Sequence, residues 1–165
     1  MAFFQKKKRE ENLTADEALV KLEQFCAFRD RCSHEVRQKM RELKLDRDTC
    51  DTLFEALEND GFVDDDRFAR MFALGKFRQS GWGRVRIKQE LGMRAIKQNL
   101  IETALAEISE EDYAVALTDI LEKKAGLYKD EKDGWQKLAQ LAIRRGFEPG
   151  LVFEAIKVLK TKESA

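Results

Sequence analysis

The stretch IKQELGMRAIKQNLIETALAEI, residues 87 to 108, contains a set of six apolar residues that lie three to five positions apart. This spacing fits the buried faces of helices and not the strict alternation of a half-buried strand. The same pattern returns 51 residues away in both directions. The three sets are Ile87, Leu91, Ile96, Ile101, Leu105 and Ile108; Val36, Met40, Leu45, Cys50, Phe54 and Leu57; and Leu138, Ala142, Phe147, Val152, Ile156 and Leu159. An internal repeat of about fifty residues is therefore predicted.

Each copy is too short to bury its own core well, so stacking of the copies should stabilise them. We predict an all-α fold of three tandem three-helix repeats in an elongated, curved array. The predicted helices span residues 14–28, 33–44, 46–58, 64–79, 84–93, 95–108, 110–127, 133–145 and 149–160. The predicted segments are a basic N-terminal tail (1–13), repeat 1 (14–63), repeat 2 (64–109), repeat 3 (110–160) and a C-terminal tail (161–165).

Polar residues and glycines mark the ends of these helices. Thr14 with Glu17, Asp46, and Ser109 with Asp112 can accept hydrogen bonds from the free amides of a first helical turn. Stops fall at Gly61, at Gly81-Trp82-Gly83 and at Gly146, because glycine readily adopts positive φ.

The composition favours a folded cytoplasmic protein. The chain has 165 residues, of which 43% are hydrophobic and 38% charged, with a single proline. No window resembles a membrane span or a secretory signal. Three cysteines without paired C-x2-C spacing are expected to be reduced thiols. We expect a monomer.

Catalytic and metal-binding motifs are missing from the sequence. The only histidine, His34, follows Cys32 but has no second pair with which to complete a zinc site. The consecutive Asp64 to Asp66 point in different directions along a helix, so capping explains them better than magnesium binding does. Phosphate-binding glycine loops and zinc-hydrolase motifs do not occur. We expect no enzymatic activity, no cofactor and no metal.

Charge is sorted into blocks along a chain whose net charge is zero. Residues 42–66 sum to −8, residues 67–101 to +8 and residues 102–122 to −7. Arginine and aromatic residues are typical anchors of protein interfaces and also of nucleic-acid sites. Within the basic block, Arg86 lies one turn before Glu90 and can pair with it. The candidate partner-binding residues are Arg67, Arg70, Lys76, Arg78, Trp82, Arg84, Arg86 and Lys88.

The central part of the chain resembles the signature of the RecX regulatory proteins. The matching residues are Phe62, Asp64-Asp65, Arg67-Phe68-Ala69, Arg78, Gly81, Gly83, Arg86-Ile87 and Glu90-Leu91. Weaker similarity extends over Ser33 to Leu43 and over Leu138 to Ile156. The family usually has a glycine where this chain has Ala95, and a proline where it has Arg84. Because alanine resists positive φ, we expect the turn at Ala95 to be wider or more helical.

The resemblance implies a three-unit helical protein that binds the RecA recombinase. Such a protein lodges in the groove of RecA filaments on DNA and modulates ATP hydrolysis, filament extension and strand exchange, in homologous recombination, DNA repair and the SOS response. The alternative is direct DNA binding by the basic central repeat, since paired helices around a tight turn can place one helix in a groove. The run Lys6 to Arg9 is expected to be a tail rather than a reader of bases.

Overall fold

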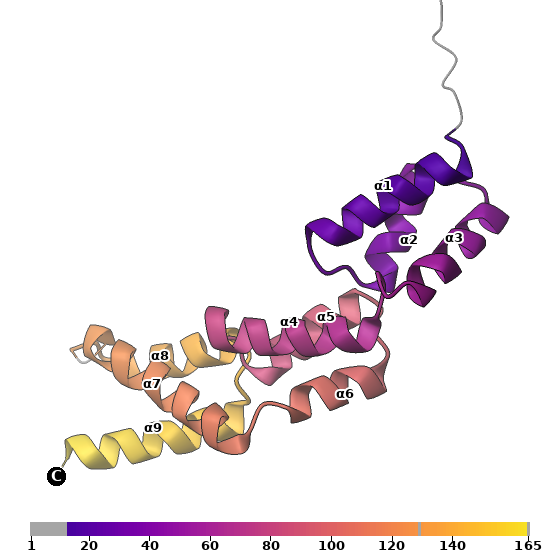
Figure 1. Cartoon of the computed structure of the whole chain (residues 1–165). Coiled ribbons are helices and arrows are strands. Elements are labelled where there is room, and N and C mark those ends of the chain that lie inside the picture. The colour runs from indigo at the N-terminus through magenta and orange to yellow at the C-terminus, as the bar shows by residue number, and fades with distance from the viewer. Residues whose placement is uncertain (1–12, 129, 165) are drawn as a thin grey trace, which may run out of the picture. The chain divides into compact units, whose positions relative to one another are not determined.

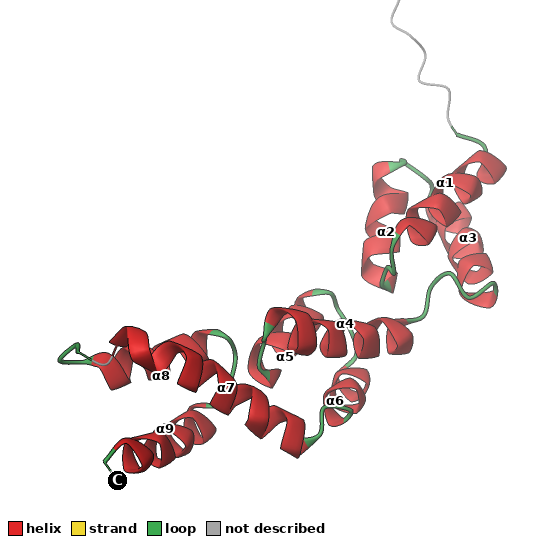
Figure 2. Cartoon of the chain, turned by 60° about the vertical axis from the view of Figure 1, so that its left-hand side comes forward, coloured by secondary structure: helices red, strands yellow, loops and turns green. Residues whose placement is uncertain are grey.

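The computed structural model describes residues 13–128 and 130–164 (Figure 1). The predicted basic tail lies almost wholly outside these residues. The described part folds into nine α-helices without a strand, joined by short loops (Figure 2). The helices are α1 (Ala15–Phe28), α2 (Ser33–Glu42), α3 (Arg47–Asn59), α4 (Asp65–Ser80), α5 (Arg84–Met93), α6 (Gln98–Ala106), α7 (Glu110–Tyr128), α8 (Gly134–Arg144) and α9 (Pro149–Glu163). The prediction of an all-α helical-repeat fold is confirmed.

The chain divides into two compact units, one ending at Asp64 and the other beginning at Asp65. The N-terminal unit contains α1, α2 and α3, which pack against one another around Leu22, Val36, Met40 and Leu57. Its first helix begins with the predicted capping box: Glu17 N donates to Thr14 Oγ1 at 3.2 Å, and Thr14 N donates to the Glu17 carboxylate at 2.9 Å. Asp46 likewise accepts from the Thr49 amide at 3.0 Å to begin α3.

The C-terminal unit contains the other six helices. Helix α4 packs on both α5 and α6, and α7 packs on both α8 and α9. Ser109 Oγ accepts from the Asp112 amide at 3.0 Å, as the sequence predicts for the start of α7. Helix α9 extends through Glu163, three residues past its predicted end.

The repeat of 51 residues appears in the core. Of the eighteen positions that the sequence aligns, all are buried except Leu45, Cys50 and Leu105, which are half-buried. The register that the sequence predicts is therefore the register of the fold.

The backbone repeats with the same period. Lys44, Ala95 and Gly146 are 51 residues apart, and each has positive φ, at 57°, 56° and 97°. At each site the next residue donates a backbone hydrogen bond to the carbonyl five residues before it, which closes the end of a helix in the Schellman manner. These bonds are Leu45 N to Met40 O (3.3 Å), Ile96 N to Leu91 O (3.2 Å) and Phe147 N to Ala142 O (3.2 Å).

The expectation of a wider or more helical turn at Ala95 is therefore wrong. Burial of Leu91 and Ile96 on either side fixes the turn, and this packing outweighs the local preference of alanine. Because the turn consumes residues 95 to 97, α6 begins at Gln98 rather than at residue 95.

Candidate functional site

The described helices fall into three groups of three: α1–α3, α4–α6 (the second helix group) and α7–α9 (the third helix group). In the second helix group, predicted site residues that are exposed cations lie on α4 and α5. Arg67 and Arg78 are eleven residues apart on α4, which is close to three full turns, so they lie on the same face. Both are exposed, and Met71 between them is 60% exposed. Lys88 on α5 is also exposed. These three cations form the part of the predicted surface that is most open to a partner.

Arg70 belongs to a different arrangement. Its guanidinium donates to Asp66 on the same helix at 3.0 Å and also pairs with Glu107 just after α6. This guanidinium links α4 to the residue after α6, and the carboxylates of Asp66 and Glu107 offset its charge. Arg70 therefore mainly stabilises the packing of α4 and α6, and it contributes little unpaired positive charge to the surface.

Trp82 lies half-buried under two cations. The guanidinium of Arg86 is 3.9 Å from the centre of the indole, and Lys76 Nζ is 4.8 Å from it. Phe72 meets the indole edge to face at 6.4 Å. Cation–π attraction orients both cations and keeps their charge at the surface. The expected pairing of Arg86 with Glu90 is wrong, because Glu90 pairs with Arg94 at 2.8 Å.

Arg84 joins the second helix group to the third. Its guanidinium lies 4.1 Å from the centre of the Tyr113 ring, donates to the Ile108 carbonyl at 2.9 Å and pairs with Glu110 at 2.8 Å. Only 17% of the side chain is exposed. The same contact holds the pKa of Glu110 below its ordinary value. Arg84 thus acts inside the C-terminal unit.

Tyr113 is the buried centre of this junction. Its hydroxyl accepts from the Arg84 amide at 3.0 Å and donates to Glu148 at 2.6 Å, while its ring packs on Phe77 and Phe147. Burial, followed by the hydrogen bond to Glu148, raises the pKa of Tyr113 strongly. The phenol therefore stays neutral and remains a hydrogen-bond donor throughout the usual pH range.

Two glycines bring the backbones of the two helix groups together. Gly83 N donates to Arg145 O at 2.8 Å, and Val85 N donates to Gly146 O at 3.0 Å. A Cβ on Gly83 would overlap the Gly146 carbonyl, and one on Gly146 would lie 2.6 Å from Arg86 N. The start of α5 is thereby fixed on the turn between α8 and α9.

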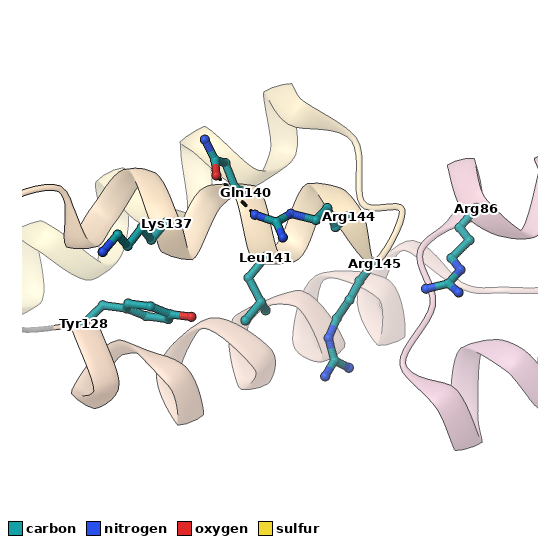
Figure 3. A pocket seen from close by; sticks show the side chains of 7 residues that line it. All are labelled: Arg86, Tyr128, Lys137, Gln140, Leu141, Arg144 and Arg145. Carbon is teal, nitrogen blue, oxygen red and sulfur yellow. Dashed lines mark hydrogen bonds between the residues drawn. The ribbon is translucent and has the colours of Figure 1, made fainter.

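A groove of about 530 Å³ lies beside this junction. It is lined by Arg86, Tyr128, Lys137, Gln140, Leu141, Arg144 and Arg145 (Figure 3). Arg86 and Arg145 reach it from two facing elements, and the Tyr128 ring lies opposite α8 (Figure 3). Of the predicted site residues, only Arg86 lines this groove. Lys137, Arg144 and Arg145 are not among the predicted site residues, although two adjacent arginines before a turn glycine were a usable signal.

Residues 13–128 and 130–164 contain no group of three metal-ligating side chains, and none of their three cysteines forms a disulfide bond. In the same part of the chain, no helix combines the length and apolar character that crossing a bilayer requires. Together, the fold and the cationic surfaces define a helical-repeat protein with features suited to binding large anionic or acidic partners.

Comparison with known proteins gives the family. Models of the second and third three-helix domains of RecX match residues 64–105 and 110–156. A regulatory protein RecX from Halorhodospira halophila is 32% identical over 123 residues, which cover 73% of this chain and 74% of the relative. One from Amycolatopsis mediterranei is 26% identical over 151 residues, covering 88% and 86%. This chain belongs to the RecX family of regulatory proteins.

A solved structure agrees on the fold. The crystal structure of RecX from Lactobacillus salivarius superposes with a TM-score of 0.81 at 20% identity, over 89% of this chain and 97% of that one. Some relatives are longer: the chain spans about half the length of those from Oceanobacillus iheyensis and Halalkalibacterium halodurans, at 52% and 53%.

Proposed function

We propose that this chain binds RecA recombinase filaments in the cytoplasm and restrains their ATP hydrolysis, extension and strand exchange. It acts by contact and carries out no chemical step. The observation that carries the proposal is an exposed cationic surface on α4 and α5 in a member of a family of regulatory proteins.

The contact surface in this proposal is the outer face of α4 and α5. Arg67, Arg78 and Lys88 supply exposed charge, and Met71 supplies an apolar contact between the two arginines. Lys76 and Arg86, held on Trp82, extend the surface. Arg70 and Arg84 contribute indirectly, because their ion pairs hold the helices that present the other cations.

Arginine at this surface suits carboxylates of a protein partner, because its planar guanidinium can donate two parallel hydrogen bonds. The negative blocks before and after it discourage general adsorption to nucleic acid and complement basic regions of a partner. Such contacts weaken with added salt, since exposed charges are screened beyond about 10 Å at 0.1 M ionic strength.

Co-sedimentation with RecA filaments tests the proposal. The double variant Arg78→Ala, Lys88→Ala removes two exposed cations from the surface, and the matched control Lys123→Ala, Lys157→Ala removes two exposed cations from α7 and α9. We expect the parent and the control to sediment with filaments and the double variant to bind at least several-fold more weakly. Equal binding by both variants would place the contact elsewhere, and no binding by the parent would reject RecA as the partner.

A further inference from the structure

The groove lined by Arg86, Lys137, Arg144 and Arg145 holds more positive than negative charge. Its lining includes four cations and no carboxylate. Lys137 is paired with Glu131, and Arg144 donates only to the neutral side-chain carbonyl of Gln140 at 3.3 Å. Among the described residues, no acidic side chain forms an ion pair with Arg86, Arg144 or Arg145. Three guanidinium charges therefore remain uncompensated around one concave surface.

This arrangement attracts anions strongly. A concave site lined by charges of one sign focuses the electric field and raises the local concentration of ions of the opposite sign. Mutual repulsion of the guanidinium groups disfavours the empty groove, and an anion between them removes that repulsion. Guanidinium groups also match the geometry of phosphate oxygens, to which they donate two hydrogen bonds at once.

Arg86 and the backbone of Arg145 are anchored before any ligand arrives. Arg86 stacks on Trp82 at 3.9 Å, and its backbone lies against the turn at Gly146. The backbone of Arg145 is fixed because its carbonyl accepts from Gly83 N at 2.8 Å. Fixing the groups in advance reduces the conformational entropy that is lost on binding.

An aromatic and apolar wall completes the groove. In Figure 3 the ring of Tyr128, at the end of α7, lies near Lys137, and the side chain of Leu141, on α8, lies between that ring and Arg145 in this view. Tyr128 is half-buried. Cations near an accessible aromatic ring are the usual combination for single-stranded nucleic acids, in which phosphates meet the cations and a base stacks on the ring. An acidic peptide would use the cations but would gain no stacking from the ring.

We propose that this groove binds the backbone of single-stranded nucleic acid. Arg86, Arg144 and Arg145 contact successive phosphates, and the Tyr128 ring stacks with a base. The surface differs from the outer face of α4 and α5, with only Arg86 in common. The proposal does not depend on RecA, because it concerns bare nucleic acid.

Fluorescence anisotropy with a labelled oligo-thymidylate tests the proposal on the full chain. We expect the double variant Arg144→Ala, Arg145→Ala to bind at least ten-fold more weakly than the parent. Removing two phosphate contacts should also make the slope of log affinity against log salt shallower by about 1.4, at about 0.7 per contact for single strands. The single variant Arg144→Ala, at an exposed position, should show about half of this change in slope without any risk to the fold. The control Lys123→Ala, Lys157→Ala makes the same change in net charge and should keep most of the affinity.

Three further probes separate the ligand classes. Tyr128→Ala should weaken binding to oligo-thymidylate more than binding to an abasic strand of equal length. A poly-glutamate competitor should displace the strand only at much higher charge concentration than unlabelled oligo-thymidylate does. Three results would overturn the proposal. The first is an equal loss of affinity in the Arg144→Ala, Arg145→Ala variant and in its control. The others are tighter binding of a duplex through the same arginines and equal competition by poly-glutamate. RecA binding is measured separately, so either proposal can fail alone.

Discussion

Replacing Gly83 by alanine should separate the second helix group from the third. The added Cβ would overlap the Gly146 carbonyl, and that carbonyl belongs to a backbone turn that cannot rotate away. Three hydrogen bonds depend on this approach: Gly83 N to Arg145 O, Val85 N to Gly146 O, and Arg84 N to the Tyr113 hydroxyl. At about 1 kcal/mol each, their loss should destabilise the C-terminal unit by about 3 kcal/mol.

Thermal unfolding followed by circular dichroism measures this effect. A loss of about 3 kcal/mol should lower Tm by roughly 6 to 12 °C in a chain of this size. The matched control is Gly75→Ala in the middle of α4, where a Cβ meets no atom within 4 Å. There alanine should stabilise the helix by up to about 1 kcal/mol. If Gly83→Ala had the same Tm as the parent, the close approach of the Gly83 and Gly146 backbones would be incorrect, and so would the groove that depends on it.

Three other changes test single features of the fold. Ala95→Gly should stabilise the chain by up to about 1 kcal/mol, because glycine removes the strain at φ 56°; a lower midpoint in urea would mean that the turn is not strained. Tyr113→Phe should cost about 1–3 kcal/mol by leaving Glu148 and the Arg84 amide without their partner, and an unchanged urea midpoint would contradict the assigned hydrogen bonds. Hydrogen bonds from the Thr49 side chain and amide lower the pKa of Asp46 from its ordinary 3.8. The cap therefore contributes stability above pH 3.8, and this contribution is lost as the pH falls through the lower pKa of the folded state. Acid titration should therefore destabilise the parent more than Asp46→Asn, whose amide cap does not titrate; identical acid profiles would contradict the assigned cap.

The sequence predicts the helices and their cores because those features repeat locally. Six apolar positions with a period of 51 residues identify the buried faces, and short polar side chains such as Thr14 and Ser109 mark helix starts through bonds within three residues. Gly61, Gly81 and Gly146 adopt the positive φ that their positions indicate. Ala95 does not follow its local preference, because the burial of Leu91 and Ile96 dictates the turn.

The electrostatic pairing was harder to predict. Glu90 has an arginine one turn away on each side, and helical spacing alone cannot choose between Arg86 and Arg94. Trp82 decides the choice, because its ring attracts Arg86 and leaves Glu90 to Arg94. That contact depends on the path of the chain between α4 and α5, about which the spacing of charges carries no information.

The groove could not be derived from any single stretch. Its lining comes from α5, the end of α7, and α8 with the turn that follows it, so it exists only once the two glycines have joined the helix groups. The sequence nevertheless contains a signal in Arg144-Arg145-Gly146, where two cations precede a turn. Recognising that Gly83 and Gly146 meet would have placed these arginines next to Arg86.

The most direct test of the proposed function is the rate of ATP hydrolysis by RecA filaments assembled on single-stranded DNA while this chain is titrated in. We predict a rate that falls with dose and reaches a low plateau, with the curve of the Arg78→Ala, Lys88→Ala variant displaced to higher concentration. A rate that stayed constant up to a large molar excess of the folded parent chain would contradict the account.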